Sequence, residues 1–323
     1  MSAVARPPIR WVTGRRAPRW LAAYLAVVVL FVASYWLVGP DFASLSGLWN
    51  ILVLASFVAL AGAGQGLVVL TGGIDLSIPW VMTLAGILTT AWADNNNAAL
   101  SWTIPVVLAI AVGVGVVNGL GVVALGISPV VFTIATNVIL QGVVLVVTNG
   151  TPQGQAPPLL KGIMHDRAAG IPIIVLLLIV FAVLVGLLMS RTSFGQRTYA
   201  LGTSESVARL SGVSSARVLL GVYAFSAVAA ALAGILLTGY ASQSYLGMGD
   251  AYLLPSIAAV VIGGSSILGG RGHYAGTFAG AVFLALLGSV IAATGLSNAM
   301  RQVLFGLVIL VAVIAVRDRS REA

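Results

Sequence analysis

Few side chains in this sequence could carry out chemistry, and Asp75 is the most notable of them. It lies in the run TGGIDLSIPWVM at residues 71–82, where two glycines, an aspartate and a proline interrupt an otherwise apolar stretch. A carboxylate at membrane depth is typical of a proton relay, but relays are built from several ionisable groups. Asp75 is the single good candidate, so the sequence does not favour proton coupling.

The sequence also offers no site for ATP, a metal ion or covalent catalysis. The only lysine, Lys161, follows Leu160 and precedes Gly162, whereas a phosphate-binding P-loop requires lysine directly after glycine. There is no cysteine, and the two histidines, His165 and His273, are far apart. No nucleophile and base are paired as an enzyme would need. We therefore expect a non-enzyme without its own cofactor, whose energy comes from a partner.

Neutral side chains that could hydrogen-bond a polar solute lie within the apolar stretches. Residues 133, 137 and 141 are spaced i, i+4 and i+8, which predicts one shared helix face. Hydrogen bonding between helices is the alternative role for each such residue. The candidates for a translocation pathway or its gate are Gln65, Asp75, Ser77, Asn118, Thr133, Asn137, Gln141, Gly263 and Gly264.

The composition indicates an integral membrane protein. Of 323 residues 59% are hydrophobic and only 7% are charged, with a mean hydropathy of +1.08, whereas soluble domains are about 25% charged. A membrane-crossing helix needs about 20 largely apolar residues. The stretches that meet or approach this requirement are 20–38, 49–70, 78–93, 102–125, 128–148, 171–190, 217–240, 253–270, 274–294 and 300–316. The predicted fold is therefore all-α, with ten transmembrane helices.

The charges predict the orientation of these helices. The net charge of +8 comes from residues that flank apolar runs, which favours a topological role over nucleic-acid binding. If the N-terminus is cytoplasmic, only Lys161, Arg167 and Arg301 of the 16 basic residues fall outside. The first apolar run is too long for a signal peptide. We expect a cytoplasmic basic segment at 1–19, a membrane domain at 20–316 and a cytoplasmic tail at 317–323.

Two glycine-rich breaks interrupt the predicted helices. In 71–82 we expect a helix end, an unwound turn and a new helix capped by Asp75 or Ser77, with Pro79 in its first turn. A second break follows at 263–272, with the sequence GGSSILGGRG. Irregular backbone at membrane depth is tolerated where it is buried in protein or lines a path. Similar GIS and GLS runs at 126–128 and 295–297 suggest two inverted repeats.

The longest predicted cytoplasmic loop, residues 191–216, is suited to a partner. Thr203 or Ser204 is a good N-cap, Glu205 complements the helix dipole and Gly212 is a natural stop. The pattern predicts a helix of about two turns that offers a small apolar surface to a groove. A short helix lying at the membrane interface is the alternative.

Several motifs together resemble a known family. They are GGIDLS at 72–77, TNG at 148–150, the loop from Thr192 to Gly212, AAVVIGG at 258–264 and GGRG at 269–272. In this order and spacing they resemble the permease subunits of ribose- or xylose-type sugar ABC importers, within the branched-chain amino acid and sugar permease superfamily. The similarity runs from about residue 50 to 316.

The resemblance implies a complete transport machine. Its members are ten-helix permeases of bacterial cytoplasmic membranes that pair with a second permease copy or paralogue. Two cytoplasmic ATPase subunits bind ATP and Mg, and an extracytoplasmic protein delivers a sugar, here a pentose or hexose. In that family a coupling helix between spans six and seven sits in a groove of the ATPase. The matching positions here are Gly202, Glu205, Ala208, Arg209, Leu210, Ser211 and Gly212.

The sequence departs from the family pattern at two places and leaves other readings open. Ile78-Pro79-Trp80 stand where Val-Gly-Ser is common, and Gln141-Gly142 stand where the family often has arginine before glycine. Both departures bear on which sugar is moved. The same architecture could import a nucleoside or a branched-chain amino acid. A stand-alone secondary carrier is the alternative from a different class.

Overall fold

The computed structural model describes residues 20–293 and, beyond them, positions 295, 297, 300, 303, 304, 306, 307 and 310. The predicted segments 1–19 and 317–323 lie outside the described residues, as does most of the predicted span 300–316. The described helices are α1 Trp20–Leu37, α2 Leu45–Leu70, α3 Ile78–Ala93, α4 Leu100–Ala124, α5 Pro129–Thr148, α6 Pro158–His165, α7 Ile173–Arg191, α8 Ser193–Thr203, α9 Glu205–Leu210, α10 Ser215–Ala241, α11 Leu253–Ile262 and α12 Tyr274–Ala293.

The predicted all-α class holds for this part of the chain, apart from a minimal hairpin. Strands Arg167–Ala168 (β1) and Ile171–Pro172 (β2) pair antiparallel, with Ala168 opposite Ile171. A single 3-10 turn, Asp250–Tyr252, leads into α11. The hairpin and α6 lie in the connection between α5 and α7.

Seven of the described helices are long and apolar enough to cross a membrane. They are α1, α2, α4, α5, α7, α10 and α12, and each overlaps a predicted span. Two more predicted spans fall on the shorter apolar helices α3 and α11. The predicted span 253–270 is wrong at its end, because α11 stops at Ile262 where Gly263 and Gly264 follow. With ten residues α11 is too short to cross a membrane by itself.

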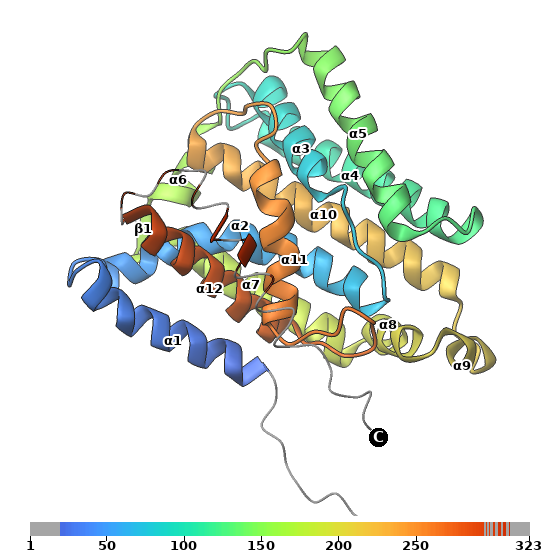
Figure 1. Cartoon of the computed structure of the whole chain (residues 1–323). Helices are drawn as coiled ribbons and strands as arrows, with labels where there is room; N and C mark the ends of the chain where they lie inside the picture. The colour runs from blue at the N-terminus through green and yellow to red at the C-terminus, as the bar shows by residue number, and fades with distance from the viewer. Residues whose placement is uncertain are drawn as a thin grey trace, which may run out of the picture.

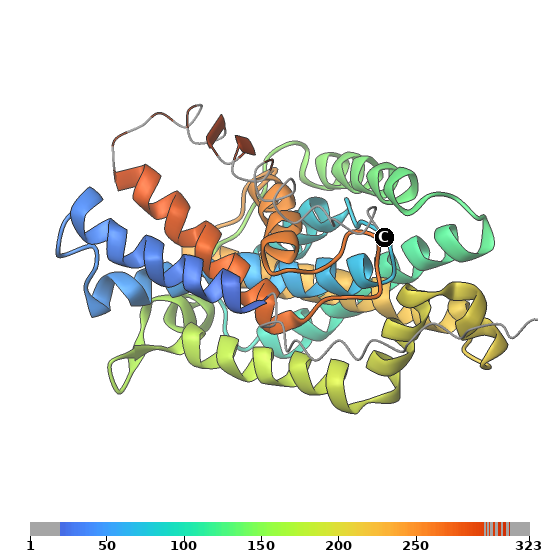
Figure 2. The ribbon, with the colours of Figure 1, turned by 60° about the horizontal axis from the view of Figure 1, so that its bottom comes forward.

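Helices α2 and α10 form the centre of the molecule (Figure 1). Every residue of α2 from Ala55 to Leu70 is buried, as expected of a helix that is apolar on all sides and surrounded by other helices. Helix α10 packs against α2, α3 and α4, and α12 packs against α2 and α11. Figure 2 shows α1 lying along α12, on the side of the molecule away from α5.

Small residues let the central helices approach closely. A Cβ atom at Gly115 of α4 would overlap the carbonyl oxygen of Tyr223 in α10, and one at Gly276 of α12 would overlap that of Gly263. Membrane helices gain stability from such close backbone packing because lipid competes with every apolar side chain. The many glycines of this chain therefore serve helix packing at these positions.

Candidate translocation and coupling sites

The first break, residues 71–77, begins with a glycine-dependent helix end. The amide of Gly72 donates to the carbonyl oxygen of Val69 at 2.9 Å, and that of Gly73 donates to Val68 at 3.1 Å. This is a Schellman end, which needs a left-handed residue, and Gly72 has φ +82°. The chain then runs without helix to Ile78, so the predicted unwound turn is present.

Asp75 lies at the centre of the first break, and only 1% of its surface is exposed. Its Oδ1 accepts hydrogen bonds from the amide of Ser77 at 2.9 Å and from the Ser77 hydroxyl at 2.6 Å. Its Oδ2 accepts from the hydroxyl of Ser226 in α10 at 2.7 Å. Asn118 of α4 donates from Nδ2 to Ser77 Oγ at 2.8 Å. The break is thus joined to two long helices through one buried carboxylate.

The cap predicted for α3 differs in detail. Ser77 occupies the N-cap position, but its backbone is helical (φ −84°, ψ −12°) and its side chain accepts no hydrogen bond from the first turn. Its hydroxyl donates to Asp75 and accepts from Asn118 instead. Asp75 receives the amide of Ser77 itself rather than one from within α3. Pro79 lies in the first turn as predicted, where a missing amide proton costs nothing.

Thr133 joins α5 to the same break. Its Oγ1 accepts the amide proton of Leu76 at 3.0 Å and donates to the carbonyl oxygen of Pro129, 2.8 Å away, with Ile74 O at 3.2 Å. Asn137, one turn along, is half-buried, and Gln141 is exposed. Steps of four residues drift around a helix of 3.6 residues per turn. The predicted 133–137–141 face therefore rotates outward, and the buried face is Thr133, Thr136, Leu140 and Val144.

Gln65 is the most unusual of the candidate residues. Its side chain is fully buried in α2, and neither its amide nitrogen nor its oxygen has a partner among the described residues. A buried polar group without a hydrogen bond costs about 1–3 kcal/mol. Gly64 beside it packs against Ser226 of α10, and Gly66 faces Thr277 of α12. Gln65 thus lies on the part of α2 that faces α10 and α12, six residues before the first break.

The second break, residues 263–273, follows α11, which ends in the same Schellman geometry as α2. The amide of Gly264 donates to Val261 O at 2.9 Å and that of Ser265 donates to Val260 O at 3.1 Å. Gly264 has φ +85° and is the left-handed residue of this Schellman end. Gly263 is buried against the backbone of α12. The structure thus brings together Asp75, Ser77, Asn118 and Thr133 in one cluster, and places the Gly263–Gly264 pair in a separate helix end.

The 191–216 loop contains two helices where the sequence predicted one. The predicted helix is α9, whose N-cap Ser204 accepts the amide of Val207 at 3.4 Å. Gly212 has φ +80° and closes α9, and Arg209 lies 3.9 Å from Glu205. Helix α8 was missed, although Thr192 marks its start by accepting the amide of Gly195 at 3.3 Å.

The exposed face of α9 is narrower than the sequence suggested. Leu210 is 90% exposed and Val207 is 60% exposed, so two apolar side chains point away from the chain. Ala208, which the sequence placed on the same docking surface, is buried and faces the body of the molecule. Val207 and Leu210 are three residues apart and are therefore neighbours on the surface of α9.

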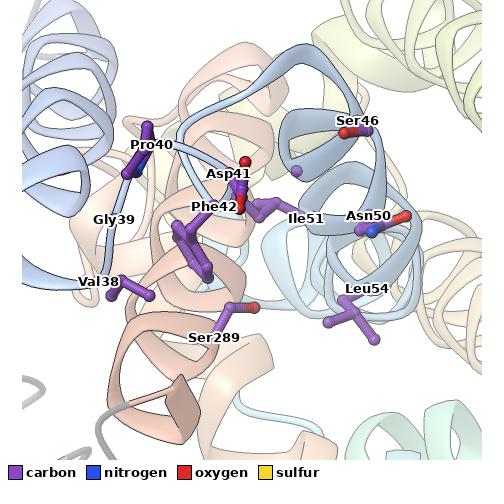
Figure 3. Close-up of a pocket in the computed structure, with 11 residues that line it drawn as sticks. Val38, Gly39, Pro40, Asp41, Phe42, Ser46, Asn50, Ile51, Leu54 and Ser289 are labelled. Carbon is purple, nitrogen blue, oxygen red and sulfur yellow. The ribbon is translucent and has the colours of Figure 1, made fainter.

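A cavity of about 520 Å³ lies apart from all of these residues. It is formed by the α1–α2 connection, the start of α2 and Ser289 of α12, with Asp41, Asn50 and Phe42 on its wall (Figure 3). None of the predicted pathway residues lines it.

Long apolar helices, a glycine-rich break with a buried polar cluster, a second glycine-rich break and an exposed loop helix define a multi-pass helical membrane protein. The family model of the branched-chain amino acid transport system / permease component matches residues 47–313, and the chain belongs to this family. It is therefore a protein of a transport-permease family.

Individual relatives cover nearly the whole chain. The ribose import permease protein of Haemophilus influenzae is 33% identical over 91% of this chain and 91% of its own length. That of Escherichia coli K12 is 31% identical over 94% and 97%, respectively. The fructose import permease protein of Bifidobacterium longum is 32% identical over 78% and 72%. No solved structure matches at the significance that these relatives reach.

Proposed function

We propose that this chain is the membrane permease of an ATP-driven importer that takes up a monosaccharide of the pentose or hexose type. The observation that carries the proposal is the similarity to ribose import permeases, which extends over more than nine-tenths of both chains. The fructose import relative supports the same class of cargo. A relative at 26% identity is an autoinducer 2 import permease, so cargoes other than ribose and fructose also occur among the relatives.

A separate ATPase supplies the energy in this proposal and binds ATP and Mg. The chain has no P-loop, and α9 offers Val207 and Leu210 to an apolar groove. Glu205, Arg209 and Ser211 lie exposed beside them and are the polar contacts we expect at its rim. Gly212 follows the end of α9, Gly202 lies in the last turn of α8 just before it, and the buried Ala208 packs against the bundle.

The pathway in this proposal runs past the first break and along the exposed side of α5. Gln141 is a polar side chain on the exposed side of a membrane helix, and Asn137 beside it is half-buried with its Oδ1 unpartnered. Exposure of such groups to lipid is costly. A second permease copy or paralogue packed there would leave these residues facing a hydrated path between the two chains. Gln65 and the second break complete the candidate gate.

The extracytoplasmic side includes the 149–170 connection. Its helix α6 and the β1–β2 hairpin present Lys161, Asp166 and Arg167. Opposite charges on the sugar-binding protein would steer its docking to this surface.

We further propose ten membrane helices in two inverted repeats, with both termini in the cytoplasm of a bacterial-type cell. The similar Gly-Gly helix ends of α2 and α11 support the repeats, and the distribution of basic residues supports the orientation. Because the chain has no cysteine, single cysteines report the topology cleanly. We expect Arg10→Cys, Glu205→Cys and Ser320→Cys to react with a membrane-impermeant maleimide only from the cytoplasmic side. External labelling at any of the three would overturn this topology.

The central test is co-purification from native membranes with a tag on this chain. We expect an ATPase and a second permease in the complex, and uptake of labelled ribose or another monosaccharide that depends on ATP and on the cognate binding protein. A panel that includes nucleosides and branched-chain amino acids tests the alternative cargoes. Uptake by the purified chain alone down an ion gradient would instead establish a secondary carrier.

A further inference from the structure

The end of α8 lies against both helix breaks. The amide of Gly270, in the second break, donates to the carbonyl oxygen of Leu70 at 2.9 Å, and Leu70 is the last residue of α2. Tyr199 of α8 donates from its hydroxyl to the carbonyl oxygen of Gly272 at 2.8 Å. Figure 1 shows the α11–α12 connection reaching α8. The second break is therefore held between the end of α2 and the end of α8.

These contacts are made between backbones with no room for side chains. A Cβ atom on Gly202 would overlap the carbonyl oxygen of Leu70 and lie 2.7 Å from the amide nitrogen of Gly270. A Cβ atom on Gly270 would lie 2.9 Å from Thr203 Cα, and one on Gly269 would lie 3.1 Å from Gly202 O. We call Leu70, Gly202, Gly269 and Gly270 the glycine junction.

Backbone contact of this kind transmits displacement well. Side chains between two elements can absorb a small shift by changing rotamer, but the glycine junction has no side chain in its contacts and its packing is tight. Helix α8 ends at Thr203 and α9 begins at Glu205, so a single residue, Ser204, separates them. A displacement of α9 therefore reaches the glycine junction through a very short connection.

We propose that the glycine junction is the element through which the bound ATPase moves both helix breaks together. This inference rests on the proposed function. Movement of α9 shifts the end of α8, and the end of α8 displaces the second break and the end of α2 in one step. The first break follows directly after Leu70, so Asp75 and its partners are moved by the same contact.

The test uses the assembled complex and a reporter that needs no knowledge of the sugar. Leu268, in the second break, is 87% exposed, and Leu268→Cys would be the sole cysteine of this chain. Its maleimide labelling rate is measured with and without ATP, alongside ATP hydrolysis. We expect ATP to change the rate about fivefold or more, the lower range of ordinary allosteric coupling. Gly202→Ala should abolish this response in the complexes that still assemble with the ATPase.

The matched control is Gly186→Ala in α7, where a Cβ atom meets no heavy atom within 4 Å. We expect it to respond to ATP as the unmodified reporter does. Tyr199→Phe keeps the ring and removes only the hydrogen bond to Gly272, so it should weaken the response of the reporter to ATP. If the Gly202→Ala complex fails to assemble, the response of Tyr199→Phe tests the proposal in its place. A merely structural role would lower the yield of complex but leave its response to ATP unchanged.

Two outcomes overturn the proposal and are distinguishable from each other. The glycine junction alone is refuted if the ATPase binds but the Tyr199→Phe complex and every assembled Gly202→Ala complex respond to ATP like the control. It is also refuted if the ATPase binds but the reporter never responds to ATP. A chain that carries no ATPase refutes the proposed function and the junction with it.

Discussion

Asp75→Leu is expected to lower uptake by about a hundredfold, with a smaller fall in the amount of protein in the membrane. Leucine leaves the amide and hydroxyl of Ser77 and the hydroxyl of Ser226 without their acceptor. Each orphaned buried donor costs about 1–3 kcal/mol, and about 3 kcal/mol corresponds to a hundredfold change in an equilibrium. Helices α2 and α10 also pack against each other away from this site, so the bundle should stay folded. We therefore expect the lost hydrogen bonds to change mainly the conformation of the first break. Uptake normalised to membrane-inserted protein measures this effect.

Two milder variants locate the effect. Asp75→Asn keeps an oxygen that can accept from both groups of Ser77, and Ser226→Ala removes only the link to α10. Both should transport better than Asp75→Leu. Wild-type uptake by Asp75→Leu would show that the first break tolerates any buried side chain and that Asp75 has no part in transport.

Leu210→Asp is expected to weaken association with the ATPase at least about tenfold, while the membrane bundle stays folded. The side chain is 90% exposed in this chain, so its replacement removes no internal contact. The few central residues that carry most of the binding energy of an interface contribute about 2 kcal/mol or more when they are truncated, and we expect Leu210 to be one of them. Pull-down of the ATPase from detergent-solubilised complex, compared at equal permease amounts, measures the loss.

Neighbouring residues of α9 provide the controls. Ser206→Ala changes an exposed residue of the same helix and should leave association nearly unchanged. The Glu205–Arg209 pair is 3.9 Å apart with both side chains more than half exposed, so it contributes at most about 1 kcal/mol to folding. A weaker complex with Glu205→Gln or Arg209→Gln would thus report docking. If Leu210→Asp binds the ATPase normally, α9 is not the docking helix.

Composition and periodicity were enough to predict much of this protein. Low charge and long apolar runs predict a helical membrane protein because the bilayer imposes helix length and internal hydrogen bonding. Local signals located the break before Ile78, the start of α9 to within one residue (Thr203 or Ser204) and its end before Gly212. They could do so because caps and left-handed glycines act within a few residues. The set of five motifs, in their order and spacing, also indicated the family that the comparisons then established.

Tertiary packing decided what the local pattern left open. Spacing alone grouped Thr133, Asn137 and Gln141, but contact with the first break buries Thr133 while Gln141 remains exposed. The sequence placed Ala208 on the docking face, but packing turned it inward. These outcomes depend on which elements meet in space. The sequence of a helix alone does not say which of its sides will face a neighbouring helix.

The partners of Asp75 and Gly202 show the same division most clearly. Ser226 lies 151 positions from Asp75 in the chain, and Gly202 meets Leu70 and Gly270, which are also far from it in the sequence. The sequence by itself determined the membrane-spanning class, the helix breaks and the family, since these follow from local composition and motifs. Only the tertiary structure determined which break touches which helix, because hydrogen bonds and backbone contacts between distant segments form after the helices have packed.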